Sequence, residues 1–98
     1  MITAIVLLHC DVGVIPETAQ AVAEIDTVSE VYSVTGDWEL VAMVRVGHHE
    51  DIADVVTGTI AKIPGVTATH TMIAFRAYAS TDLERMWGVG FDAGQDTD

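Results

Sequence analysis

Hydrophobic residues recur along the chain in two similar blocks that are offset by 38 residues. The offset aligns identical residues: Ala4 with Ala42, Val6 with Val44, Ala23 with Ala61, Ile25 with Ile63, and Val28 with Val66. Each block has the pattern of an apolar strand, an amphipathic helix and a second strand. The doubled βαββαβ unit predicts a ferredoxin-like α+β sandwich, with a four-stranded antiparallel sheet and two helices on one face.

The expected strands cover about residues 2–9, 28–35, 39–46 and 66–78. The first helix is predicted to begin at Pro16 and to end near Asp26, with a buried stripe of Ile15, Ala19, Val22 and Ala23. The second begins at the acidic pair Glu50-Asp51 and stops at Pro64-Gly65. Its predicted buried face consists of Ile52, Val55, Val56, Ile60 and Ile63. A capping box at residues 81–84 predicts a short third helix ending near Trp87.

Two of these strands are apolar on both faces. One face carries Ala4, Val6, Leu8, Leu40, Ala42, Val44 and Val46, and the opposite face carries Ile5, Leu7, Val41 and Met43. Because right-handed crossovers place both helices on one side of the sheet, the other side needs a different cover. The sequence therefore predicts a homodimer in which two sheets pack face to face.

Composition limits the classes of function. The 98 residues suffice for one domain, and 15 acidic against 4 basic residues give a formal charge of −11, which argues against direct nucleic-acid binding. The one cysteine, Cys10, is expected to be a small buried side chain in a reducing compartment. With no signal peptide or membrane span expected, a cytoplasmic location is predicted. The expected division is a domain over residues 1–79, a helical extension over 80–91 and a disordered acidic tail over 92–98.

Two segments carry candidate binding groups. The junction between the blocks, Ser33–Leu40, combines a glycine, two carboxylates and an indole, which suit the ammonium and carboxylate groups of an amino acid. Gly36-Asp37 is also an ordinary turn signal, which is the simpler interpretation of composition alone. Thr67, Thr69 and Thr71 share one face of the fourth strand, either as β-formers or as a polar rail for a small ligand.

Other chemistry is not indicated. His48-His49-Glu50-Asp51 contains metal-ligating residue types, but no third ligand follows at a suitable spacing, so a solvated helix start is expected. His9 and His70 fall on strands, with no nucleophile at a recognisable spacing. We predict no catalytic residues, no metal and no cofactor.

Two blocks together resemble a known family. Thr35-Gly36-Asp37-Trp38-Glu39-Leu40, followed by a strand, a helix and Ile63–Thr71, is similar to the effector-binding (RAM) domain of Lrp/AsnC-type transcription regulators over roughly residues 1–79. Tryptophan replaces the commoner tyrosine, and glutamate replaces the commoner aspartate. Regulators of this family carry an N-terminal helix-turn-helix, whereas this sequence starts at the first strand, so it resembles a stand-alone form.

The resemblance implies a dimer with facing sheets, dimers assembled into an octamer or another ring, and an amino-acid effector bound between dimers. Carried over by position, the effector site would use Gly36, Asp37, Trp38 and Glu39 together with Thr69, Thr71, Met72 and Ile73, with His49 nearby. The main hypothesis is a non-enzymatic amino-acid sensor that acts on transcription indirectly and joins full-length regulators through its dimer surface. The alternatives are a dimeric ferredoxin-like enzyme, such as a small monooxygenase, and a purely structural oligomerisation module.

Overall fold

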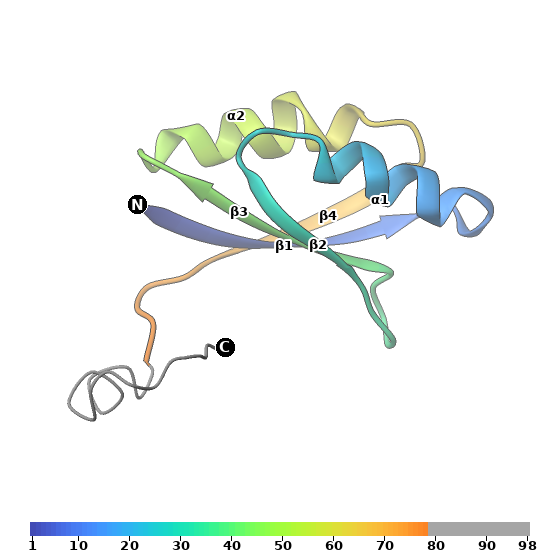
Figure 1. Ribbon diagram of the computed structural model, residues 1–98, viewed down its shortest axis with the longest axis horizontal. Helices are drawn as coiled ribbons and strands as arrows, with labels where there is room; N and C mark the ends of the chain where they lie inside the picture. The colour runs from blue at the N-terminus through green and yellow to red at the C-terminus, as the bar shows by residue number, and fades with distance from the viewer. Residues whose placement is uncertain (79–98) are drawn as a thin grey trace, which may run out of the picture.

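The computed structural model describes residues 1–78 and has the predicted βαββαβ order (Figure 1). The strands are β1 (Ile2–Cys10), β2 (Val28–Ser33), β3 (Leu40–Val46) and β4 (Val66–Ile73). The helices are α1 (Ile15–Ala23), entered through the 3-10 turn η1 (Val12–Val14), and α2 (Glu50–Gly58), followed by the 3-10 turn η2 (Ile60–Lys62). The predicted third helix and acidic tail lie outside the described residues.

The four strands form one antiparallel sheet in the order β2-β3-β1-β4. The two first strands of the repeat, β1 and β3, are therefore the central pair, and Ile2 lies opposite Val46 at one end of their register. Both helices cover the same face of the sheet (Figure 1). The ferredoxin-like prediction is confirmed.

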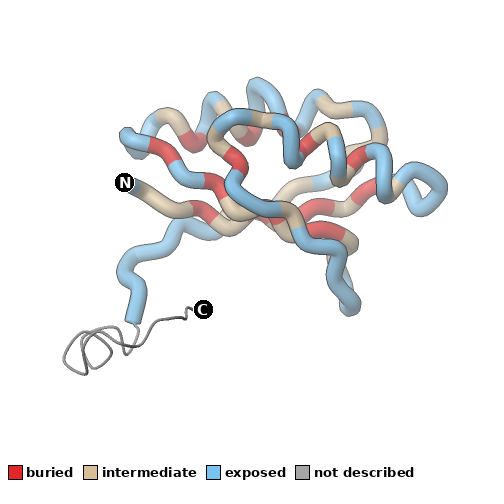
Figure 2. The backbone as a smooth tube through the Cα atoms, in the orientation of Figure 1, coloured by how far each residue is buried: buried red, intermediate tan, exposed pale blue. Residues whose placement is uncertain are grey.

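The core lies between the sheet and the two helices (Figure 2). Leu8 and Leu40 pair across the central strands and are fully buried, as is Val22 on α1. The second helix and its 3-10 extension contribute Ile52, Val56 and Ile60, as predicted. Alternation along β1 and β3 thus places one set of apolar residues under the helices.

One end of the core has a close backbone approach that only glycine permits. Gly65 has a φ of +100°, and a Cβ atom there would collide with Thr18 Oγ1. Thr18 is buried and its hydroxyl donates a 3.3 Å hydrogen bond to the carbonyl oxygen of Pro64. The buried stripe of α1 therefore includes Thr18, and the prediction of Ala23 in that stripe is wrong, because Ala23 is exposed at the end of the helix.

Several predicted boundaries differ from the structure, among them the end of α1, which lies at Ala23 rather than near Asp26. The fourth strand ends at Ile73 rather than Tyr78, although β1 continues through Thr3 and Ile2 and the backbone N–H of Ala74 still donates to the carbonyl oxygen of Thr3. The second strand ends at Ser33 rather than Thr35, where the loop to β3 begins. The regular part of α2 ends at Gly58, since glycine is a poor helix former, and the predicted helix continues only as η2.

The second face of the sheet is not covered by any helix or strand of residues 1–78 (Figure 1). Its central side chains are partly buried by their own neighbours: Ile5, Leu7, Val41 and Met43. On the outer strands, the side chains of Tyr32 and Met72 are 50% and 41% exposed. We call this surface the open face; its covering by a second copy of the chain stays a prediction.

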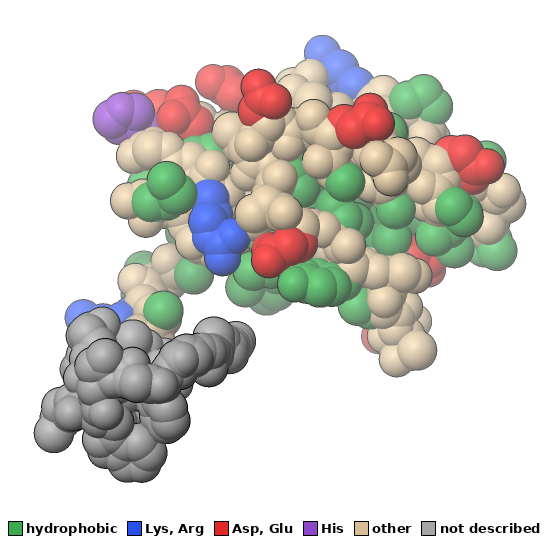
Figure 3. Space-filling view, in the orientation of Figure 1, with side chains coloured by type: hydrophobic (Ala, Val, Ile, Leu, Met, Phe, Trp, Pro, Cys, Tyr) green, Lys and Arg blue, Asp and Glu red, His purple; other side chains and the backbone are tan. Residues whose placement is uncertain are grey.

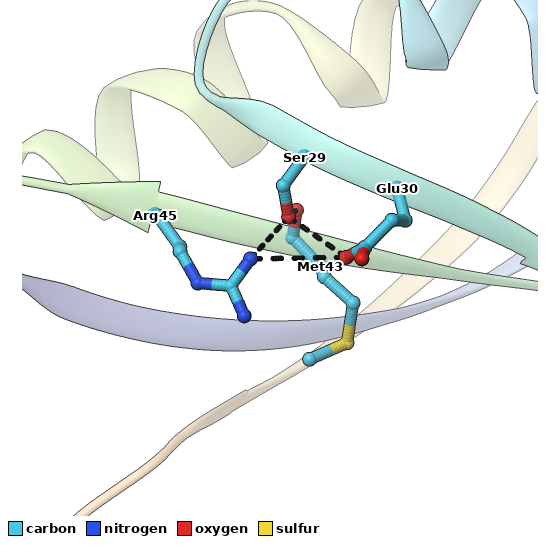
Figure 4. A network of polar contacts seen from close by, with 4 residues as sticks. All are labelled: Ser29, Glu30, Met43 and Arg45. Carbon is cyan, nitrogen blue, oxygen red and sulfur yellow. Dashed lines mark hydrogen bonds and ion pairs between the residues drawn. The ribbon is translucent and has the colours of Figure 1, made fainter. Parts of the chain in front are cut away.

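A cluster of polar side chains lies at one edge of the open face (Figure 4). Arg45 on β3 donates to the hydroxyl of Ser29 on β2 and lies 3.7 Å from the carboxylate of Glu30. The Ser29 hydroxyl also contacts the carbonyl oxygen of Met43 at 3.2 Å. Both charged side chains are exposed, so the pair stabilises the monomer little. The carboxylate of Glu30 does, however, offset the positive charge of Arg45 next to the apolar side chains of the open face.

Acidic side chains lie along the helical side in the view of Figure 3. None of the helices in the part of the chain that the structure describes is long and apolar enough to cross a membrane.

Candidate functional site

The loop between β2 and β3, residues 34–39, is a closed turn anchored to β1. The backbone N–H of Val34 donates to the carbonyl oxygen of Glu39 at 3.0 Å, and the N–H of Glu39 donates to the carbonyl oxygen of Leu8 at the same distance. Gly36 has a φ of +110°, a conformation that glycine adopts at little cost. The predicted turn at Gly36-Asp37 is confirmed, and it lies beside the carboxyl end of β1.

The side chain of Glu39 extends the pairing between β3 and β1. The regular register of these strands stops at Leu8 opposite Leu40, and Cys10 lies beyond it. Glu39 Oε1 accepts a 2.9 Å hydrogen bond from the backbone N–H of Cys10 and lies 3.2 Å from His9 Nδ1. An ionised carboxylate only accepts, so Nδ1 is the donor. The Glu39 carboxylate thus accepts the hydrogen bond from Cys10 that a backbone carbonyl of a neighbouring strand would otherwise accept.

These contacts change the acidity of two groups. The hydrogen bond from the Cys10 backbone, followed by the one from His9, holds the pKa of Glu39 below its usual value. Burial raises the pKa of the Cys10 thiol, with a further contribution from the negative charges of Glu39 and Asp11. Cys10 therefore remains a neutral thiol at pH 7, and the prediction of a small buried side chain at a strand end is confirmed.

Trp38 lies over two histidines that come from different strands. Its indole stacks on the imidazole of His9, with ring centroids 3.9 Å apart and an interplanar angle of 14°. The ring of His70 on β4 lies 6.0 Å from the indole and is tilted by 38°. His70 pairs with Leu7, so these rings belong to the open face. The loop thereby reaches back over the sheet.

The four candidate residues of β4 fall on two faces of the sheet. Thr69, Thr71 and Ile73 pair with the buried residues Leu8, Val6 and Ala4, and therefore face the helices. Met72 pairs with Ile5 and faces the opposite side. The predicted common face of Thr69 and Thr71 is confirmed as a geometric feature, whereas Met72 cannot join them in one site of a single chain.

A hollow of about 430 Å³ lies between α2 and the edge strand β4. Its apolar lining comes from Ile52, Ala53, Val56 and Ile73. Its polar lining comes from His49, Glu50, Thr57 and Thr71. Three residues named from the sequence, His49, Thr71 and Ile73, are thus brought together here. Glu50, Ala53 and Thr57 were not predicted as site residues, although their spacing along α2 could have indicated one helix face.

The loop and the hollow lie on different faces of the sheet. Trp38 of the loop stacks on His9 on the open face, whereas Thr71 and Ile73 face the helices. The two are also displaced along β1, since the loop is anchored at Leu8 while Thr71 and Ile73 pair with Val6 and Ala4. The loop and the hollow of one chain therefore do not form a single site.

The residues 1–78 contain no group of three or more His, Cys, Asp or Glu side chains arranged to hold a metal ion. His48 to Asp51 lie at the start of α2, where Asp51 and Ile52 donate backbone hydrogen bonds to the carbonyl oxygens of His48 and His49. This segment begins the helix, as expected from the sequence.

A family model described as the Lrp/AsnC ligand binding domain matches residues 3–83. The chain belongs to the Lrp/AsnC ligand-binding domain family. The HTH-type transcriptional regulator FL11 of Pyrococcus horikoshii is 33% identical over 78 residues, which are 80% of this chain and 51% of that protein. The chain thus spans about half the length of the curated Lrp/AsnC relatives that it matches most fully.

Solved structures agree with this assignment to the Lrp/AsnC family. TTHA0845 from Thermus thermophilus is 47% identical with a TM-score of 0.77, over 81% of this chain and 99% of that one. E. coli AsnC shares the fold, with a TM-score of 0.73 and 18% identity over 78% of this chain and 52% of that one. The Lrp/AsnC relatives are transcription regulators and the matched part is a ligand-binding domain, so the enzyme alternative is wrong.

Sequence reasoning missed the roles of His9 and Glu39. The sequence predicts His9 on a strand without chemistry and indicates Glu39 only as an effector ligand. The signal was available in the register: if Ile2 opposes Val46, continuing the antiparallel pairing places His9 opposite Glu39.

Proposed function

We propose that this domain is an amino-acid-binding oligomerisation module that modulates transcription indirectly. The hollow between α2 and β4 is the observation that carries this proposal. Its volume of about 430 Å³ lies in the range typical of small-molecule sites, about 300–1,000 Å³. An apolar lining beside a few polar groups suits an amino acid with an aliphatic or thioether side chain.

The polar groups of the hollow are matched to the two ends of such a ligand. The carboxylate of Glu50 suits the α-ammonium group, while His49 and the hydroxyl of Thr71 offer hydrogen-bond donors for the α-carboxylate. The side chain of the effector would rest against Ile52, Val56 and Ile73. The family's description as a ligand-binding domain supports this use.

The second half of the site comes from a neighbouring dimer in this proposal. We call residues 34–39 the effector loop. It offers the exposed Gly36 and Asp37, together with Trp38 and Glu39, and it does not form a single site with the hollow of its own chain. A ring of dimers, such as an octamer, would place the loop of one dimer over the hollow of the next. Ligand binding at this junction would favour the ring by its differential affinity for that state.

The open face serves as the dimer surface. A second copy of the chain would bury the apolar centre formed by Ile5, Leu7, Val41 and Met43. Full-length Lrp/AsnC regulators carry the same domain, so they are candidate partners through the same face. The formal charge of −11 disfavours a direct contact with DNA.

Isothermal titration calorimetry against the twenty common amino acids tests the binding step. We expect heat with aliphatic or thioether amino acids, and a loss of that heat in Ala53→Trp, whose indole would fill the hollow. Ala61→Trp is the matched control, because Ala61 is exposed on η2 and does not line the hollow.

Light scattering with and without the bound amino acid tests the assembly step. We expect the mass of the assembly to increase when the ligand is added. In Asp37→Asn this increase should be smaller. An absence of heat with all twenty amino acids would overturn the sensor proposal. Binding without any change in mass would overturn the position of the site between dimers, and a stable oligomer that binds nothing would favour the structural module.

A further inference from the structure

We propose that His9 is a positioning residue of the effector loop: its imidazole, anchored by Glu39, fixes the Trp38 indole on the open face of the sheet. This role deepens the proposed function and rests on it for its biological meaning. The geometry, however, is a property of the single chain.

Three contacts in series hold the loop. The backbone N–H of Cys10 is bonded to the Glu39 carboxylate at 2.9 Å, and His9 Nδ1 lies 3.2 Å from the same oxygen. The third contact is the stack of His9 on Trp38, at 3.9 Å between ring centroids. The His9 ring therefore cannot turn without losing either the hydrogen bond or the stack.

The two acids of the loop have different roles in this arrangement. Glu39 is only 28% exposed, and its Oε1 is occupied by two contacts from β1. Asp37 is exposed, and no hydrogen bond or ion pair among the described residues engages its side chain. Asp37 is thus the carboxylate that a ligand ammonium group can approach, while Glu39 serves the loop itself.

Trp38 fluorescence tests this positioning role without any ligand. In a Trp87→Phe background, Trp38 is the only tryptophan of the chain. The fluorescence anisotropy of Trp38 and its protection from acrylamide quenching should both fall in His9→Ala, because the indole loses the ring on which it stacks. His9→Phe, which keeps an aromatic stack, should restore part of both signals. His70→Ala is the matched control, because the ring of His70 lies 6.0 Å away and is tilted, and it should leave both signals close to those of the wild type.

Folding and assembly are controlled in the same samples. Far-ultraviolet circular dichroism checks each variant, and His9→Gln replaces His9→Ala if the latter does not fold. Light scattering ensures that the mass is the same in each variant. A Trp38 signal that is unchanged in His9→Ala would overturn the proposal, as would an equal loss of signal in His70→Ala.

Calorimetry with L-leucine and L-methionine then connects the loop to binding. His9→Ala should weaken the affinity by about three- to tenfold, the ratio that an aromatic stacking contribution corresponds to. His9→Phe should restore part of it, because the stack is rebuilt. If the wild type binds no amino acid, the proposed function fails, while the fluorescence of the variants still decides the role of His9. An affinity unchanged in His9→Ala would remove the link between positioning and binding.

Discussion

Ile5 pairs with Met43, the residue that holds the same place in the second copy of the 38-residue repeat. A pseudo-twofold axis therefore passes between these two side chains, through the centre of the sheet. Both side chains lie on the open face and are partly buried by their neighbours. The symmetry of the repeat thus concentrates apolar residues at the one surface that the helices leave uncovered.

Ile5→Lys should convert the proposed dimer into a monomer, because a lysine charge at the centre of a dry interface finds no partner. Light scattering measures the change in mass. Ala61→Lys adds the same charge at an exposed position of η2 and should leave the mass unchanged. A dimer that persists in Ile5→Lys would show that the two sheets do not pack through this centre.

Glu39→Gln should lower the free energy of unfolding at neutral pH and flatten its dependence on acid. The folded state lowers the pKa of Glu39, so its stabilising contribution is present above the usual glutamate pKa, about 4.3, and is lost as the pH falls through the lower folded value. Urea unfolding at several pH values measures this. Asp54→Asn, which removes an exposed carboxylate from α2, should retain the wild-type acid dependence.

Gly65→Ala should destabilise the protein by about 1–3 kcal/mol, the usual cost of a strained backbone conformation. The left-handed φ disfavours any side chain, and the added Cβ meets Thr18 Oγ1, whose hydroxyl is held by Pro64. Thermal unfolding measures the difference. In Gly58→Ala, where a Cβ meets no atom within 4 Å, the stability should rise by up to about 1 kcal/mol. Equal effects in both variants would contradict the argument.

Cys10 should react slowly with thiol-specific reagents in the native protein. It is buried at the end of β1, and its raised pKa keeps the reactive thiolate scarce at neutral pH. The reaction rate should rise sharply when urea unfolds the chain. Rapid modification of the native protein would indicate that the end of β1 opens readily.

Prediction from the sequence was most successful where a periodicity carried the information. The faces of the two central strands and the buried face of α2 followed from alternation and from helical spacing, because burial selects one side of an element. Strand ends were less well predicted. The fourth strand stops at Ile73, although its partner β1 continues beyond Ala4 through Thr3 and Ile2, and no local pattern in residues 74–78 marks this end.

The arrangement of the candidate site residues could be predicted only in part. Thr71, Ile73 and His49 can be named from a family resemblance, but their meeting in one hollow depends on how α2 lies over β4. Met72, which the resemblance places with them, faces the other side of the sheet, because neighbouring residues in a strand point in opposite directions.

By itself, the sequence determined the repeat, the order of the elements, the apolar second face of the sheet and the family. Each of these is written in local or periodic patterns of side-chain type. Only the tertiary structure decided that His9 meets Glu39 and stacks on Trp38, and that Trp38 of the effector loop lies on the face of the sheet opposite the hollow. Such relationships depend on strand register and on the direction of each side chain, which pair residues that are distant in the sequence.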